Sequence, residues 1–144
     1  MSDRTRDLID EHGWTVIIVP EDEVGPGFAY SIGLAERFGH PEVAISGLRN
    51  GLMHQLVNDA AEVVASGTAL SDGAQTDALL EGHPCVVRAA AADTFGDYFG
   101  EAERYYQDEP FDVVQVFWPD QVGRYPWDAG YASAAQARMD GQTP

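Results

Sequence analysis

Residues 28–48 read FAYSIGLAERFGHPEVAISGL, and this stretch contains the pattern that decides the fold. Bulky apolar residues alternate with small ones over 28–34, and an alternation of the same kind returns over 42–48. Alternation with a period of two predicts β-strands, because successive side chains of a strand point to opposite faces. The connection AERFGHP is short, so the two strands are expected to pair as an antiparallel hairpin.

The small residues of this hairpin predict a face on which another element packs closely. Ala29 and Ser31 share a face of the first strand, and Ala44 and Ser46 share a face of the second. If the hairpin sets these two stripes side by side, the following segment has room to approach. That segment, NGLMHQLVNDAAEVVASG, has apolar residues at helical spacing. A helix over 51–65 is therefore expected to cover the face, and a ligand cleft is the alternative.

Further segments complete an α+β domain. A short helix is expected over 3–12, and the aromatic spacing of DTFGDYFGEAERYYQ predicts another helix despite its two glycines. Two strands follow each other directly before the helix of 51–65, which favours one mainly antiparallel sheet of about five or six strands packed against one or two helices. The expected strands are 14–19, 28–34, 42–48, 84–90 and 111–118.

Length and composition fit one domain. The chain has 144 residues, of which 44% are hydrophobic and 22% charged, as in ordinary globular proteins. We expect 1–144 to form a single domain, with a core at about 13–130 and a C-terminal tail over 131–144 that frays at its end. No apolar run reaches the length of a signal peptide core or a membrane span, so a cytoplasmic protein is expected.

The charge of the chain limits its partners. There are 24 acidic residues against 8 basic ones, all of them Arg, and the formal net charge is -16. Such a charge repels phosphate backbones and anionic lipids, so neither nucleic acid nor a membrane is an expected partner. A protein or a small cationic or peptide ligand is the expected partner, although a solvated acidic surface explains the same composition. The absence of Lys beside abundant Ala and Asp indicates a bacterial source, and the oligomeric state is left open.

The corner GHPE carries the first candidate site. Proline biases His40 toward an extended conformation, and Glu42 begins the next strand. This spacing suits an acid-base pair in which His40 is the general base and Glu42 orients it, while Arg49 holds an anionic group. Alternatively, the two residues bind loop amides and an arginine and only fix the corner. A catalytic role for His40 and Glu42 is left open at this point.

Metal and nucleophile chemistry have weaker signals. His54 or His83 could add a ligand to the His40 corner, but the spacing matches no recognised metal motif. Cys85 is the only cysteine and lies among apolar neighbours in PCVVRAA, so it is expected to be a small buried side chain. The sequence contains no GxSxG motif and no glycine loop of phosphate-binding type. No metal and no cofactor is therefore predicted.

The second candidate site is WPDQVGRYPWD, residues 118–128. Tryptophan rings beside carboxylates suit a cationic or peptide ligand, whereas buried tryptophans would only lock a turn. We expect this turn to meet the FGHPE corner at one sheet edge, where Asp120 and Arg124 would approach the His40 pair. The predicted ligand-binding residues of the chain are Tyr30, Arg49, Trp118, Asp120, Arg124, Trp127 and Asp128.

Several motifs in the same order resemble a bacterial domain family. GWTVIIVPED, FAYSIGLAERFGHPEVAISGL and VFWPDQVGRYPWD are similar to a family catalogued as a domain of unknown function, with the pattern GW-x-V, P-x-FAYTIGL, FGHPE, GL and WPD-x-x-G-x-(F/Y)PWD. The similarity covers about residues 13–130, with Ser31 where Thr is common and Tyr125 where Phe is common. It implies one cytosolic domain and no particular activity. A looser similarity joins two of the strands to suppressor-of-fused-like domains of bacterial immunity proteins.

Two functions follow from these observations. The first is a non-catalytic ligand- or protein-binding module, with an immunity-like role as one form of it. It rests on the acidic surface, the aromatic turn and the weak catalytic motifs. The alternative is a small peptide- or metabolite-modifying enzyme that uses His40 and Glu42 for acid-base chemistry.

Overall fold

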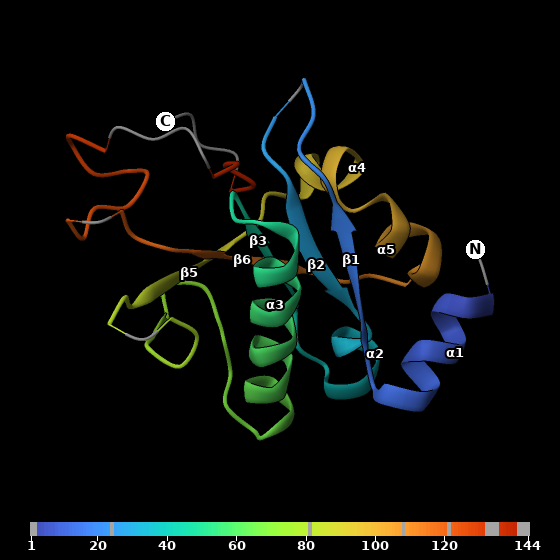
Figure 1. Ribbon diagram of the computed structural model, residues 1–144. Coiled ribbons are helices and arrows are strands. Elements are labelled where there is room, and N and C mark those ends of the chain that lie inside the picture. Colours follow the sequence, from blue (N-terminus) through green and yellow to red (C-terminus); the bar gives the residue numbers. More distant parts are fainter. Residues whose placement is uncertain are drawn as a thin grey trace.

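The structure, a computed structural model, describes residues 3–23, 25–80, 82–107, 109–120, 122–131 and 136–140. Six strands form one sheet in the order β1-β2-β3-β6-β5-β4 (Figure 1). Neighbouring strands are antiparallel except β3 and β6, which run parallel. The predicted α+β class with a mainly antiparallel sheet is confirmed. The strands are β1 Thr15–Val19, β2 Phe28–Ile32, β3 Glu42–Ser46, β4 Gln75–Thr76, β5 Cys85–Ala89 and β6 Val113–Phe117.

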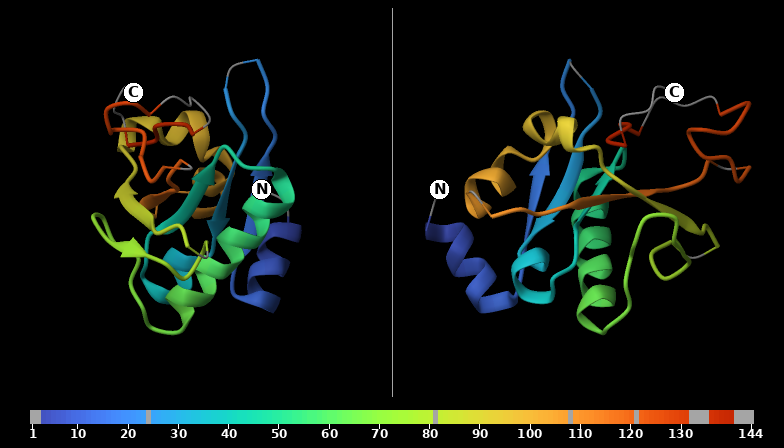
Figure 2. Two further views of the ribbon diagram at one scale, coloured as in Figure 1. Left: turned by 60° about the vertical axis from the view of Figure 1, so that its left-hand side comes forward. Right: turned by 180° about the vertical axis from the view of Figure 1, so that it is seen from behind.

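Helices cover both faces of this sheet (Figures 1 and 2). The longest helix, α3 (Asn50–Ala65), lies across one face. The other face carries α4 (Phe95–Tyr98) and α5 (Gly100–Tyr106). The helices α1 (Asp3–His12) and α2 (Leu34–Phe38) lie at one end of β1 and β2. Within the described parts of the chain, no helix combines the length and the apolar character needed to cross a membrane.

Each face of the sheet has its own hydrophobic core. On the α3 face, the buried side of the helix packs against Ala29, Val43 and Ile45, so the predicted helix over 51–65 is confirmed. On the other face, Tyr30 packs edge-on against Phe99, with ring centroids 5.1 Å apart. The sheet is therefore the middle layer of three, and β2 and β3 are buried on both sides.

The prediction that the small residues of the two hairpin strands share one face is wrong. In the observed register, Tyr30 pairs with Ala44 and Ala29 pairs with Ile45. Paired residues of an antiparallel ladder share a face, so Ala29 lies under α3 while Ala44 lies in the opposite core. Because a shift of one residue exchanges the two faces, the length of the connection decided the outcome, and that connection contains α2.

Glycine backbone conformations explain where two predicted elements end. The strand predicted over 28–34 stops at Ile32, because Gly33 has φ 126° and turns the chain into α2. The single helix predicted across DTFGDYFGEAERYYQ is broken into a 3₁₀ turn, α4 and α5. The break falls at Phe99, directly before Gly100, where the low helix propensity of glycine weakens the helix. The short strand β4 is an addition to the five strands expected from the sequence.

The C-terminal segment over residues 136–140, which belongs to the predicted tail, docks on the sheet. The amide of Gln115, on β6, donates to Ala137 O at 2.6 Å, and its oxygen accepts from Met139 N at 2.9 Å. Ser46 Oγ accepts from Ala137 N at 3.0 Å. Met139 is fully buried as a result. Residues 132–135 and 141–144 of the predicted tail lie outside the described residues.

Gly33→Ala tests the turn between β2 and α2. A Cβ at this position would lie 2.7 Å from Gly13 O and 2.9 Å from Trp14 Cα, in addition to the strain of its positive φ. We expect the melting temperature to fall by at least about 10 °C. The control is Gly39→Ala, since Gly39 also has a positive φ but has free space around it. That variant should lose only about 3–8 °C, and equal losses would contradict the role of the close approach.

Candidate functional site

The carboxylate of Glu42 is buried at the start of α2. Glu42 has no exposed surface, and its oxygens accept hydrogen bonds from three main-chain amides: Gly33 N at 3.0 Å, Leu34 N at 3.2 Å and Ala35 N at 3.1 Å. The first turn of a helix leaves such amides without intrahelical partners. A negative charge is also favoured there by the helix dipole. Glu42 therefore caps α2 from the neighbouring strand.

Two hydroxyl groups complete the shell around Glu42. Ser31 Oγ donates to Oε1 at 2.7 Å, and the Tyr106 hydroxyl of α5 donates to Oε2 while accepting from Gly33 N at 3.1 Å. Burial raises the pKa of Glu42, and the hydrogen bonds from Tyr106 and Ser31 act in the opposite direction. All five groups around the carboxylate donate, and a carboxylate satisfies all of them only when it is ionised.

His40 is engaged separately from Glu42. Its Nδ1 lies 2.7 Å from Pro41 O, and its Nε2 accepts from Leu70 N at 2.9 Å. These partners place the proton of the neutral ring on Nδ1. The ring thereby ties the GHPE corner to the segment after α3. In this geometry His40 and Glu42 each bind main-chain groups, as in the alternative considered from the sequence, and no arginine takes part in these contacts.

Glu42→Gln tests the structural role of the buried carboxylate. The NH2 group of Gln would face N–H and O–H groups that also donate. We therefore expect a loss of about 3 kcal/mol or more in the free energy of unfolding. The matched control is Glu36→Gln on α2, whose exposed carboxylate accepts one hydrogen bond, from the Tyr105 hydroxyl at 2.6 Å. That variant should lose less than about 1 kcal/mol in urea unfolding. Similar losses in the two variants would show that the donors around Glu42 contribute little to the stability of the fold.

The composite site predicted from the two motifs is wrong. β3 and β6 run parallel, with Glu42 beside Val113 at their starts. The FGHPE corner therefore lies at one end of this pair and Trp118, which follows β6, lies at the other. Trp118 Nε1 instead donates to Ser46 O, at the far end of β3, at 2.8 Å. The charged residues of the turn cannot reach His40 across the length of the sheet.

The tryptophans of the turn are used in internal packing. Trp127 stacks on Tyr125 with ring centroids 5.4 Å apart and an interplanar angle of 6°. The guanidinium carbon of Arg88 lies 3.6 Å from the centroid of the same ring, and Phe117 meets it edge-on. The aromatic surface predicted to bind a cationic ligand thus already binds an arginine of the chain itself.

The carboxylates of the turn bind its main chain. Asp120 Oδ1 accepts from Val122 N at 3.0 Å and Arg124 N at 2.8 Å, while Oδ2 lies 3.2 Å from Arg124 Nε. The Arg124 amide is the main cause that lowers the pKa of Asp120. Asp128 Oδ2 accepts from Tyr125 N at 2.9 Å. These contacts are those of side chains that close loops on their own backbone.

The stability contributed by Asp120 should depend on pH. Because its folded-state pKa is lowered, this contribution is present above the ordinary value of 3.8 and is lost as the pH falls through the folded-state pKa. Asp120→Asn should therefore melt below the wild type at pH 7, and the gap should close on acidification below pH 3.8. Thermal melts between pH 2 and pH 7 measure this. A gap that stays constant over this range would exclude the ionic contribution.

Tyr30 is almost completely buried, although it is among the residues that line a hollow of 700 Å³. It is 1% exposed and forms part of the core between the sheet and α5. Burial is the main cause that raises its pKa to about 12, with its hydroxyl beside the main chain of Glu101. Of the predicted ligand-binding residues, Tyr30 is therefore the one that the fold covers most completely.

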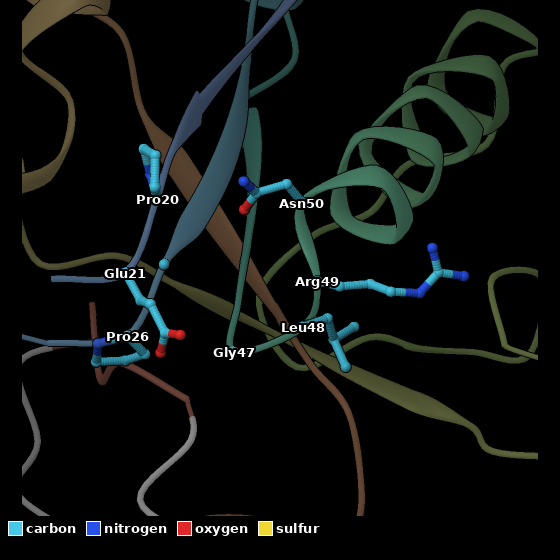
Figure 3. A pocket seen from close by; sticks show the side chains of 8 residues that line it. Pro20, Glu21, Pro26, Gly47, Leu48, Arg49 and Asn50 are labelled. Atoms are coloured by element: carbon cyan, nitrogen blue, oxygen red, sulfur yellow. The ribbon is translucent and has the colours of Figure 1, made fainter.

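Arg49 borders an open hollow of 480 Å³ at the end of the sheet. The hollow lies between the loop that joins β1 to β2 and the start of α3, with Glu21 and Asn50 among its lining (Figure 3). The Arg49 side chain extends away from Glu21 (Figure 3). The sequence patterns identified Arg49 but not Glu21 or the prolines, whose contribution depends on the turn geometry of the hairpin.

Cysteine and histidine side chains outside the GHPE corner are not gathered into a metal site in the described parts of the chain. Cys85 is buried, and burial raises the pKa of its thiol to about 11. His54 Nδ1 lies 3.2 Å from the Asn58 side-chain amide on the same helix. Among the described residues, no group of three or more His, Cys, Asp or Glu side chains is placed to hold a metal ion.

Comparison with known proteins finds one informative likeness. Residues 8–132 match a family model described as "Domain of unknown function (DUF4262)". The resemblance to a domain of unknown function noted in the sequence is confirmed to that extent. No curated protein and no solved structure matches the chain.

Proposed function

Because the chain belongs to the DUF4262 family, a domain of unknown function, its role has to be inferred from its own residues, and we propose that it is a non-catalytic binding module. The ligand would be a protein or a small molecule. The observation that carries this proposal is that the potentially reactive side chains are buried or hydrogen-bonded within the fold. His40 has both ring nitrogens engaged, Glu42 is enclosed by donors, and Cys85 is buried.

Two open hollows flank the loop of the β1–β2 hairpin. The hollow beside Arg49 lies on one side of the hairpin loop, and a larger hollow of 700 Å³ lies toward α4 and α5. Pro20 and Pro26 line both of them. Concave surface beside a fixed turn is typical of recognition sites, since the turn holds its groups in place without blocking access.

The charge of the chain supports a basic partner. At a net charge of -16, long-range attraction speeds association with a positively charged protein and disfavours an acidic one. The immunity-like role suggested by the looser resemblance would require such a protein partner. Arg49 is the one cation among the residues that line the 480 Å³ hollow. It would bind a local acidic or polar group of that partner.

Affinity capture with variants at Arg49 tests the proposal. Partners retained by the immobilised wild-type protein would be identified and then titrated by calorimetry. We expect Arg49→Glu to weaken binding by about tenfold or more, and Arg49→Lys to retain most of it. Both variants should melt like the wild type, because Arg49 is exposed and caps α3 without a side-chain hydrogen bond.

His40→Ala is the matched control for catalysis. This variant loses the hydrogen bond from Leu70 N, so its melting temperature should fall while partner binding at low temperature is kept. A turnover activity of the wild type that His40→Ala abolishes without unfolding would overturn the binding-module proposal. Equal partner affinity in wild type and Arg49→Glu would exclude the Arg49 hollow as the contact.

A further inference from the structure

Strand β1 forms an edge of the sheet. It pairs with β2 alone among the described strands, since the strand order begins with β1. Its sequence, TVIIV, contains no charge and no proline, the devices with which proteins usually protect an edge from pairing with another chain. All five residues are partly buried, and Leu8 and His12 of α1 line one hollow together with Thr15 and Val16 at the start of the strand. The edge is thus suited to strand addition, unlike a blunted edge.

The hydrogen-bond register identifies the main-chain groups that face outward. Gly47 N donates to Gly27 O at 3.0 Å, and antiparallel bonding alternates from this pair, so Ala29 faces β3 and Tyr30 faces β1. Tyr30 is paired with Ile17. The N–H and C=O groups of Ile17 therefore bond to β2, and those of the flanking residues, Val16 and Ile18, point away from the sheet.

Two hollows lie beside β1, one on each face of the sheet. The hollow of 540 Å³ on the α3 face is lined by Val16 of β1 and by polar side chains such as His54 and Glu62. The hollow of 700 Å³ on the opposite face is lined by Ile17 and by aromatic side chains such as Tyr98. An added strand would direct alternate side chains to these two faces.

We propose that β1 is the docking edge for an extended, basic segment of a partner protein, which adds to the sheet as a further strand. This inference rests on the proposed binding function and names its partner chemistry. Main-chain bonds to Val16 and Ile18 supply the affinity, while apolar side chains enter the aromatic hollow and basic ones approach the polar hollow. Glu62 in the polar hollow is a carboxylate that complements these basic groups, whereas Glu101 beside the aromatic hollow is already paired with Arg104.

Charge decides between the two kinds of strand that could occupy this edge. A second copy of the chain would bring together two molecules that each carry a net charge of -16, and would place carboxylates of both beside the shared strands. A basic segment reverses the sign of this interaction. Strand addition by a heterologous basic partner is therefore favoured over a continuous sheet between copies.

Titration with defined peptides tests the inference. The probe is a fluorescein-labelled eight-residue peptide of alternating Lys and Val, and the controls are a peptide of alternating Glu and Val and a proline-containing Lys peptide of equal charge. We expect saturable binding of the first and at least tenfold weaker binding of both controls. Hydrogen exchange should slow at the amides of Val16 and Ile18 on binding, whereas Ile17 should already be protected by β2.

Substitutions on β1 separate the main-chain contact from side-chain effects. Proline is tolerated where an edge N–H faces solvent, so Val16→Pro should remain folded, and Val16→Ala controls for the lost side chain. Val16→Pro should bind the Lys and Val peptide at least tenfold more weakly than Val16→Ala. If Val16→Pro does not fold, Glu62→Lys serves as the second variant, with weaker binding at unchanged melting temperature expected because Glu62 is exposed and lines the polar hollow.

The outcomes distinguish this inference from the proposed function. Binding of a captured partner without protection of Val16 and Ile18 would overturn the docking edge and leave the binding module intact. Equal binding of the Lys peptide and the proline-containing Lys peptide would show that charge alone causes the binding, and this would also overturn the docking edge. Dimerisation that protects the same amides without peptide would assign the edge to a second copy. A His40-dependent turnover would overturn the binding module itself.

Discussion

The buried carboxylate of Glu42 is the interaction on which the rest of the structure depends. An isolated charge inside a protein is costly, and this one is stabilised only because donors from β2, α2 and α5 converge on it. The same contacts set the angle at which the chain leaves β2 and hold the Tyr106 end of α5 against the sheet. A single side chain thus joins elements that lie up to 64 residues apart in sequence.

The two ends of the sheet have different physical characters as a consequence. At the GHPE end, polar groups are satisfied by one another and by the main chain. At the β1–β2 hairpin, two hollows flank the loop and the edge strand β1 keeps outward main-chain groups, while a smaller hollow lies beside α2 at the other end. Rigidity at the first end fixes the register of β2, and that register decides which groups of β1 are available for recognition. The recognition proposed for the hairpin thus relies on the rigid corner.

The sequence predicts most of the elements and little of their mutual arrangement. The β-branched runs and the helical spacing of residues 51–65 are local signals, and the structure places strands and α3 within two residues of them. The face of Ala44 was missed because it depends on register, which the helix hidden in AERFGHP determines. The meeting of Asp120 with His40 failed because nothing local in FDVVQVFWPD shows that β6 runs parallel to β3. The hollows beside β1 depend on helices distant in sequence, so no pattern in the strand itself reveals them.

The docking of residues 136–140 has a consequence for how the chain folds during synthesis. Ser46 and Ala137, 91 residues apart, share a hydrogen bond. The buried side-chain oxygen of Gln115 accepts its hydrogen bond from Met139 N. Until residue 140 has left the ribosome, the buried side-chain amide of Gln115 on β6 lacks its partners Ala137 and Met139, and the part of the core that Met139 completes is uncovered. Contacts of such large sequence separation also slow folding, because a long loop must close before they form. The nascent chain is thus expected to complete its core only after this segment has been translated, when α1, β1 and β2 have long been synthesised.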